Sequence, residues 1–331
     1  MQAAYYDRQG SAAEVLVVGN LPDPEPGFGE VRVKVAFSGL NPTDIKARTG
    51  FAGMLMPFPR IIPHQDGAGT IDAVGPGVPQ SRIGERVWVH KAQYGRPFGT
   101  AAQYAVIPSE NAVPLPDNAS FKTGASLGVA AITAHRCLFA DGDLRGRRVL
   151  VQGGGGVVGT AAILLAKWAG AWIAATVSRP EQEAVARNAG ADLVIDRHSG
   201  DISAQVRSAT KGEGVDRIAD VDLAGNIDTD IACLASNGVV TAYATEDPAA
   251  MLTMPFRSTM IGNCVFRFVF LPEIPEEALR SAVREVTACV AAGAYSPHIG
   301  LELPLDRIAE AHVAQQSGRT VGKILLRPAD I

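Results

Sequence analysis

The sequence predicts a two-domain α/β protein, in which a mostly antiparallel β domain accompanies a domain built on a doubly wound parallel sheet. Three observations carry this prediction. The chain has 331 residues, which is more than one hydrophobic core usually organises. Residues 1–120 hold short β-branched runs separated by Gly and Pro. From residue 123 onward, helix-length segments alternate with short apolar strands, which is the pattern of βαβ units.

The first domain is indicated by alternating runs and by the end of the chain. Residues 31–35 and 86–89 alternate and predict strands with one buried face. The run 322–326 predicts a closing strand that returns to this domain. The predicted boundaries are residues 1–122 and 268–331 for the antiparallel domain and residues 123–267 for the parallel one.

The second domain shows the elements of a parallel sheet. Its expected strands are residues 149–151, 172–177, 193–195, 217–221 and 239–243. Helices are expected over 160–169 and 181–188, and the second is opened by Pro180 and closed by Gly190. A later helix is predicted by an apolar face at helical spacing, formed by Leu279, Val283, Val286 and Val290.

Composition and charge exclude several classes of protein. The net charge of −4 comes from 30 basic and 34 acidic residues that are interspersed along the chain, without the basic stripe that nucleic acid or anionic membranes require. The N-terminus does not resemble a secretory signal, and Lys167 interrupts the most apolar long stretch. We expect a cytoplasmic protein with no membrane segment, whose four cysteines are buried free thiols.

A glycine-rich turn predicts the cofactor. The segment 149–160 runs from a strand into a helix and contains Gly-x-Gly-x-x-Gly. Such glycines allow a tight turn and let the backbone approach a pyrophosphate at a helix N-terminus. The alternative, a flexible glycine linker, does not suit a position between an apolar strand and an apolar helix. We predict a Rossmann-type dinucleotide site whose contacts in the turn are Gly154, Gly155, Gly156, Val157, Val158 and Gly159.

The residues after the second strand predict which dinucleotide binds. An NAD site usually places Asp or Glu there to hold the ribose 2′-hydroxyl, but Val177 is followed by Ser178 and Arg179. A hydroxyl and a guanidinium suit a 2′-phosphate, so we expect NADPH rather than NADH, with Arg197 as a second cation. The alternative is that Arg179 is an ordinary solvated cation. The remaining predicted cofactor contacts are Leu223 and Tyr243.

Several separated motifs resemble the medium-chain dehydrogenase/reductase superfamily over nearly the whole chain. They are PHQDGAG at 63–69, the glycine-rich turn and the closing Gly322-Lys323 pair. Further motifs are similar to those of the zinc-free quinone oxidoreductases of the zeta-crystallin type, namely GLNPTD at 39–44, AGTIDAVG at 68–75, GAD at 190–192 and residues 305–312. The resemblance implies that the antiparallel domain is a GroES-like catalytic domain.

The resemblance also implies that zinc is not bound. The three places that hold catalytic zinc ligands in the zinc alcohol dehydrogenases correspond to Asn41, Gln65 and Val129, and none of these is a good zinc ligand. His64 stands where relatives usually carry Gly, and we expect it to lie on the surface or to support the site from behind. Asp66 is expected to anchor the turn or a neighbouring cation rather than a metal.

Two polar residues are implied to lie beside the nicotinamide ring, and both are candidate catalytic and cofactor-binding residues. They are Asn41 and Thr133, whose side chains could hydrogen-bond the carboxamide or the substrate oxygen. The alternative is a turn Asn and a helix Thr. This chain also departs from family members that often carry Tyr at Lys46, Gly at Val157 and Lys at Gln182.

We therefore hypothesise metal-free hydride transfer from NADPH to a quinone, because a quinone spreads the resulting charge over its ring and needs no metal. Two alternatives remain open: reduction of 2-alkenals or other enones, and a non-catalytic NADPH-binding or structural protein. The candidate substrate-pocket residues are Lys46, Tyr94 and Phe98. The β-forming run 264–270 has the character of an edge strand, and the resemblance implies a homodimer or homotetramer formed by pairing such strands.

Overall fold

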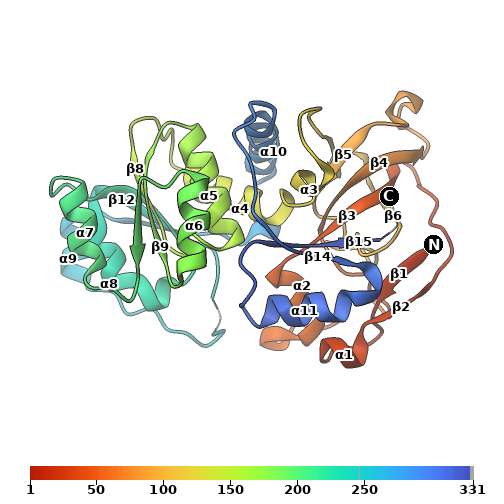
Figure 1. Ribbon diagram of the computed structural model, residues 1–331, viewed down its shortest axis with the longest axis horizontal. Helices are drawn as coiled ribbons and strands as arrows, with labels where there is room; N and C mark the ends of the chain where they lie inside the picture. Colours follow the sequence, from red (N-terminus) through yellow and green to blue (C-terminus); the bar gives the residue numbers. More distant parts are fainter. Residues whose placement is uncertain (246, 329–331) are drawn as a thin grey trace. The chain divides into compact units, whose positions relative to one another are not determined.

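The computed structural model describes residues 1–245 and 247–328, which form two compact units. The first contains Met1–Ala130 together with the segment from Ile299 onward, and the second is Ala131–His298. Each unit has a large sheet of its own (Figure 1). Helix α4 (Gly128–Phe139) begins in the last residues of the first unit's main segment. The domain boundaries expected at residues 122 and 267 stay a prediction.

The first unit is built on a seven-stranded sheet in the order β14-β15-β3-β4-β5-β7, with β6 also paired to β3. All of its pairs are antiparallel except that of β14 with β15, so the mostly antiparallel architecture is confirmed. The strands are β3 (Glu30–Leu40), β4 (Asp66–Val74), β5 (Arg86–Val89), β6 (Tyr104–Pro108), β7 (Ala112–Pro114), β14 (Ile299–Pro304) and β15 (Lys323–Arg327). A separate pair is formed by β1 (Gln2–Tyr5) and β2 (Val17–Asn20).

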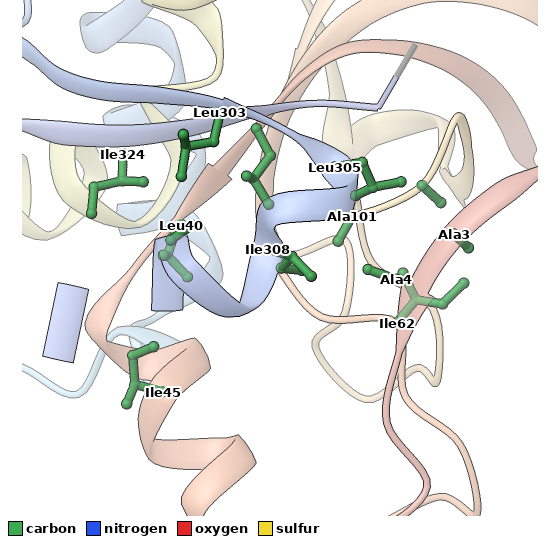
Figure 2. Close-up of a cluster of buried hydrophobic side chains, with 13 residues drawn as sticks. Ala3, Ala4, Leu40, Ile45, Ile62, Ala101, Leu303, Leu305, Ile308 and Ile324 are labelled. Atoms are coloured by element: carbon green, nitrogen blue, oxygen red, sulfur yellow. The ribbon is translucent and has the colours of Figure 1, made fainter. Parts of the chain in front are cut away.

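Four helices accompany this sheet: α1 (Ala12–Val15), α2 (Pro42–Thr49), α3 (Phe121–Gly124) and α11 (Ile308–Gln316). Figure 2 shows a core of this unit, in which Leu40 and Ile324 of the sheet meet Ile308 of α11. Burying a side chain of this size contributes roughly 1.5–3 kcal/mol. Through this core, segments from both ends of the chain are held together, which positions the strand that carries Lys323.

The second unit is a six-stranded, wholly parallel sheet in the order β10-β9-β8-β11-β12-β13. Counted within the unit this order is 3-2-1-4-5-6, the doubly wound arrangement of dinucleotide-binding sheets, so the predicted fold class is confirmed. The strands are β8 (Arg148–Val151), β9 (Trp172–Val177), β10 (Leu193–Asp196), β11 (Val215–Asp220), β12 (Leu234–Ala242) and β13 (Val265–Phe268).

The helices of the second unit are α5 (Val157–Trp168), α6 (Pro180–Ala189), α7 (Ile202–Ala209), α8 (Leu223–Cys233), α9 (Phe256–Ile261) and α10 (Glu276–Ala291). Helices α5 and α6 lie side by side against β9 (Figure 1). The buried face of α10 is rotated from the predicted one: it consists of Ala282, Val286, Cys289 and Val290, while Leu279 and Val283 are only half-buried. No helix in the described ranges has both the length and the apolarity to cross a bilayer.

Candidate active site

Asn41 lies where β3 ends and α2 begins. Its backbone N–H donates to Asp44 Oδ2 at 2.7 Å, and Pro42 occupies the first turn, where a missing N–H costs nothing. Burial raises the pKa of Asp44 to about 8, although the hydrogen bond from Asn41 opposes the shift. These local contacts fix the backbone of Asn41, which is buried.

The side-chain amide of Asn41 has a defined orientation. Its Oδ1 accepts a hydrogen bond from Lys323 Nζ at 2.7 Å, and its Nδ2 donates to Asp66 Oδ2 at 2.8 Å and to Gly39 O at 3.4 Å. An ammonium only donates and a carboxylate only accepts, so the amide cannot be reversed. Both N–H bonds of Asn41 are used within the protein. Asn41 can therefore offer a ligand only its acceptor atom, Oδ1, which Lys323 Nζ and the Asp44 N–H of the capping box already approach.

Asp66 and Lys323 form a fully buried ion pair at 2.9 Å, with side chains 0% and 1% exposed. Asp66 Oδ1 also accepts from the Val129 backbone N–H at 2.9 Å. A Cβ at Gly128 would collide with this oxygen, so the approach requires glycine there. The expectation that Asp66 anchors a neighbouring cation is confirmed. Its partner Lys323 was missed as a site residue, although the Gly-Lys motif of the closing strand was a signal for it.

The residues at the three zinc-ligand places do not form a zinc site. The amide of Asn41 is committed to Lys323 and Asp66, and Val129 contributes a backbone N–H. Gln65 Nε2 donates to Gln93 Oε1 at 3.1 Å. Within residues 1–245 and 247–328, no group of three or more His, Cys, Asp or Glu side chains could hold a metal ion. A catalytic zinc takes three such protein ligands, so the donor set does not fit.

His64 is fully buried, and the expectation of a surface histidine is wrong. Its φ is +81°, a left-handed conformation that glycine adopts without cost, which explains the Gly expected in relatives. The ring stacks on His312, with centroids 5.3 Å apart and the two Nε2 atoms at 3.0 Å. Burial, then His312, lower the pKa of His64 well below its ordinary value, and burial, then Arg48, lower that of His312 to about 3. Both shifts favour the neutral form of the ring.

The direction of each hydrogen bond through the His64–His312 pair can be assigned from Arg48, which can only donate. Arg48 Nε donates to His312 Nδ1 at 3.3 Å, so His312 carries its proton on Nε2 and donates to His64. His64 in turn donates from Nδ1 to Ser38 Oγ at 2.8 Å. Ser38 continues the chain to Thr100 Oγ1 at 2.8 Å, and Thr100 donates to the carbonyl oxygen of Asp66. This series of hydrogen bonds ends at the carbonyl oxygen of Asp66 and thereby holds the backbone of the residue that pairs with Lys323.

The glycine-rich turn of the second unit connects β8 to α5. Gly153, which the motif did not include, has φ +74° and needs to be glycine on that ground. A Cβ at Gly154 would lie 2.7 Å from Ala175 Cβ, one at Gly155 would collide with Gln182, and one at Gly159 would collide with Gly153 O. The glycines thus pack the turn against β9 and α6. Gly156 precedes α5 without a side-chain cap, which leaves first-turn amides, including those of Val157 and Val158, suited to an anion.

Ser178, Arg179 and Arg197 lie together at one edge of the parallel sheet. Arg179 is the residue before α6, and Arg197 follows β10, with its N–H donating to Val177 O at 2.8 Å. Ser178 is exposed, and its N–H donates to Gln182 Oε1 at 2.9 Å. The three residues that were expected to hold a 2′-phosphate are therefore neighbours at adjacent strand ends.

Leu223 and Tyr243 follow the carboxyl ends of β11 and β12. Leu223 is the first residue of α8, and the Tyr243 N–H donates to Asp220 O at 3.1 Å. The strand order reverses between β8 and β11, and ligands of doubly wound sheets bind outside the carboxyl ends at this switch point. The turn, Leu223 and Tyr243 all lie at this edge of the sheet.

The other candidate residues are more scattered. Thr133 is a buried residue of α4 in the second unit, whereas Asn41 belongs to the first. Lys46 Nζ lies 4.5 Å from the ring centroid of Phe51. Phe98 lines a groove of the first unit, whose lining includes neither Lys46 nor Tyr94. The three candidate substrate residues are thus not gathered around that groove.

Comparison with known proteins identifies the family. The alcohol dehydrogenase GroES-like domain model matches residues 27–117, and the zinc-binding dehydrogenase model matches residues 157–288. A zinc-type alcohol dehydrogenase-like protein of Schizosaccharomyces pombe is 30% identical over 322 residues, covering 90% of this chain and 91% of that protein. The chain belongs to the medium-chain dehydrogenase/reductase family. As a member of this family it is an oxidoreductase with a GroES-like and a Rossmann-type domain.

Other members of the family extend the comparison. The quinone oxidoreductase of Mus musculus is 29% identical over 308 residues, covering 92% of this chain and 90% of that protein. A solved structure described as an NAD-dependent alcohol dehydrogenase superposes with a TM-score of 0.88 at 29% identity, with 99% of both chains covered. A mycobacterial protein complexed with NADPH superposes with a TM-score of 0.85 at 27% identity, covering 99% of this chain and 100% of that one.

Proposed function

We propose that this protein reduces quinones by metal-free hydride transfer from NADPH. The observation that carries the proposal is the set of residues at the zinc-ligand places. There, the Lys323 ammonium holds the Asn41 amide, and Gln65 and Val129 supply no thiolate, imidazole or carboxylate. Without such ligands an alkoxide has no metal to stabilise it. A quinone suits this site, because its ring spreads the charge that hydride transfer creates, and the name of the mouse relative supports this acceptor class.

NADPH is the proposed cofactor, and it supplies the hydride when bound. The residues that would hold it are the amides of the glycine-rich turn, with Ser178, Arg179 and Arg197 at the 2′-phosphate. Two arginines and an exposed serine at adjacent strand ends favour a dianionic phosphate over a ribose hydroxyl. The NADPH complex of the mycobacterial relative supports this assignment, and the NAD-dependent relative makes NADH the competing cofactor to test.

The roles of the chain's own residues follow from their hydrogen bonds. Asn41 would accept one hydrogen bond from the nicotinamide carboxamide through Oδ1, while Lys323 and Asp66 keep the amide from turning. The Thr133 hydroxyl would donate to the carboxamide or to the substrate oxygen. Solvent supplies the proton that completes the hydroquinone, and no side chain is assigned as an essential acid.

Steady-state kinetics test this function directly. The protein is dialysed against a chelator, its zinc content is measured by elemental analysis, and NADPH or NADH oxidation is followed with matched panels of quinones and enones. We expect turnover with quinones and NADPH without stoichiometric zinc. Faster turnover of enones would reassign the substrate, and binding of NADPH without turnover in either panel would indicate a non-catalytic protein. Retained zinc that is needed for activity would overturn the proposal.

The Arg179→Ser variant tests the cofactor preference. Loss of a charge-assisted bond to phosphate should raise the KM for NADPH by roughly 10- to 100-fold and leave that for NADH within about twofold. Arg187→Ser is the control, since Arg187 lies on α6 and pairs with Glu183. Equal losses for both cofactors would show that Arg179 does not read the 2′-phosphate.

We also propose that the protein assembles as a homodimer through β13. This strand is an edge of the parallel sheet, and it presents exposed apolar side chains at Val265 and Phe268. Phe270 continues this apolar surface, and Met260 and Ile261 of the preceding helix α9 are exposed as well. An unpaired edge strand of this composition is stabilised by pairing with a second copy. A tetramer would be a further association of two such dimers.

A further inference from the structure

Two carboxyl groups that the proposed function does not use lie buried in the second unit. Asp220 ends β11, Asp230 lies on α8, and both are 0% exposed. Oδ1 of Asp220 accepts from the Asp222 N–H at 2.6 Å and from Asn226 Nδ2 at 3.0 Å. Oδ1 of Asp230 accepts from Gln152 Nε2 at 2.7 Å. One oxygen of each carboxyl is therefore satisfied by donors of the protein.

The second oxygen of each carboxyl does not receive a hydrogen bond from the described residues. Oδ2 of Asp220 and Oδ2 of Asp230 are buried, and no donor in the described part of the chain reaches either one, while the two carboxyl groups contact each other. Carboxylates only accept hydrogen bonds, so two of them form a stable buried contact when one proton lies between them. We propose that Asp220 and Asp230 share a single proton and that this proton positions the glycine-rich turn for dinucleotide binding. The second half of this inference rests on the cofactor site proposed above.

The route from the carboxyl pair to the turn is a short series of hydrogen bonds. Gln152, the residue before the turn, is held by Asp230 at Nε2 and accepts from Thr176 Oγ1 at 2.7 Å through Oε1. Thr176 Oγ1 in turn accepts from the Gly153 N–H at 3.0 Å. Asp230 thereby holds Gln152 at the start of the turn and, through Gln152, Thr176 near the end of β9. Thr176 lies two residues before Ser178. Loss of the shared proton would place two negative charges in contact, separate the carboxyl groups and release Gln152.

The surroundings favour the protonated pair. Burial, then the neighbouring Asp220, raise the pKa of Asp230 well above its ordinary value. Cys233 follows on α8, and burial, then Asp230, raise the pKa of its thiol to about 12. Tyr243, which directly follows β12, faces Asp220, and its phenol pKa is raised by burial, then by Cys137 and Asp220. A thiol and a phenol carry no positive charge in either protonation state, so these neighbours do not compensate a second negative charge.

The nearest cation does not change this balance. Arg207 of α7 faces Cys233 and donates to the carbonyl oxygens of Ala232, Gly212 and Leu234. It is not among the groups that shift the pKa of Asp230, for which Asp220 and Gln152 are the polar neighbours. No described cation therefore takes the place of the proton.

The Asp230→Asn variant imitates the protonated carboxyl. Its Oδ1 accepts from Gln152, and its Nδ2 donates to Asp220 Oδ2, so the contact no longer depends on pH. Asp228→Asn is the matched control, because Asp228 is an exposed carboxylate on the same helix. If Asp230→Asn does not fold, Asp220→Asn serves instead. Its amide N–H would donate to Asp230 and take the place of the shared proton.

Infrared difference spectroscopy of the ligand-free protein tests the proton itself. At neutral pH the wild type and Asp228→Asn should show, in addition to the band of Asp44, whose pKa burial raises to about 8, the carbonyl stretch of one further buried protonated carboxyl, which disappears at alkaline pH. Asp230→Asn should lack this band at every pH. A wild-type spectrum that matches that of Asp230→Asn in this region at neutral pH would overturn the proposal whatever the protein binds.

Two measurements test the link to the turn. The Kd for NADPH and the amide hydrogen exchange of residues 152–160 are compared between wild type and Asp230→Asn at the same pH values. For each measurement, the ratio of the wild-type value to the Asp230→Asn value should be near one at neutral pH. It should reach about tenfold at alkaline pH, the size expected for one lost hydrogen bond. Ratios that do not change with pH would refute the positioning role. If no variant binds NADPH, the proposed cofactor fails, and the exchange ratio still decides this inference.

Discussion

Single residues in this protein act mainly through buried polar partners that lie far away in the sequence. Lys323 is 257 residues from Asp66, and His312 is 248 residues from His64. Sequence reasoning identified Asn41 and Asp66 because each belongs to a local motif. It could not identify which residue completes each contact, since neither spacing nor periodicity brings position 323 to position 66. That information appears only once β15 pairs with β3.

The Lys323–Asp66 pair should be sensitive to the loss of either charge. In Lys323→Met, Asp66 keeps a buried charge without a cation, so we expect a loss of about 3–5 kcal/mol in the free energy of unfolding. The added change Asp66→Asn should recover part of this loss by removing the charge. Urea denaturation measures both, with Lys34→Met as the control, because Lys34 is exposed on β3. A Lys323→Met variant as stable as the control would contradict the role of the pair.

The His64–His312 pair should make the protein sensitive to acid. Both pKa values are lowered in the folded state, so below about pH 6.5 the unfolded chain binds protons that the folded chain does not. The contribution is complete above that pH and is lost as the pH falls, by up to about 1.4 kcal/mol per pH unit for each histidine.

His64→Gly should remove one histidine's share of this acid slope while keeping a residue that tolerates φ +81°. Urea denaturation at a series of pH values measures the slopes, with His198→Gln as the control because His198 is exposed. Equal slopes for His64→Gly and the wild type would show that His64 is protonated in the folded protein.

At the scale of elements, the sequence predicted the strands best where apolar runs were unbroken. The strand expected over residues 172–177 is β9 with the same bounds. By contrast, β12 begins at Leu234, five residues before the expected start. Asn237 has φ +62° and Gly238 follows it, so a bent, partly exposed stretch interrupts the apolar pattern. Tertiary pairing with β11 on one side keeps the strand continuous through this bend.

The glycine-rich turn should tolerate substitution unequally. A Cβ at position 159 would strike the Gly153 carbonyl oxygen, whereas at Gly156 the nearest atom is 3.3 Å away and φ is −77°. Gly159→Ala should therefore displace α5 from the turn and lower stability by roughly 1–3 kcal/mol, while Gly156→Ala should change it by less than about 1 kcal/mol. Thermal unfolding of the two variants measures the contrast. Comparable losses would show that close packing is not what requires glycine at 159.

At the scale of the whole molecule, the two-sheet architecture was predictable because the two halves use different periods, alternating strands in one and βαβ units in the other. The strand order of the parallel sheet was not readable in detail, since order depends on handed crossovers rather than on local pattern. The closing strand was expected to return to the first domain, and β15 does pair with β3. The sequence did not indicate that this strand would lie between β14 and β3.

The proposed dimer can be tested at the β13 edge. Phe268 is 69% exposed at the end of this strand, so Phe268→Lys should leave the fold intact and place charge in the interface. We expect a dimer for the wild type by light scattering and at least about tenfold weaker association for the variant. Phe28→Lys, at an exposed position of the first unit, is the control. A wild type that is monomeric at all concentrations would exclude the dimer.

Strand β15 comes from the C-terminal segment of the chain, so the ribosome synthesises the whole second unit before the first unit can be completed. The second unit is a continuous stretch, Ala131–His298, whereas the first is completed by strands that follow it in the chain. A nascent chain that has not yet reached Lys323 holds Asp66 without its cation, and burying that carboxylate alone is costly. The second unit can therefore mature during translation, while the first unit, which carries Asn41, must wait, although most of it is synthesised first. In that interval β3 lacks its partner β15 and leaves a strand edge exposed, which is a feature that chaperones protect in a nascent polypeptide.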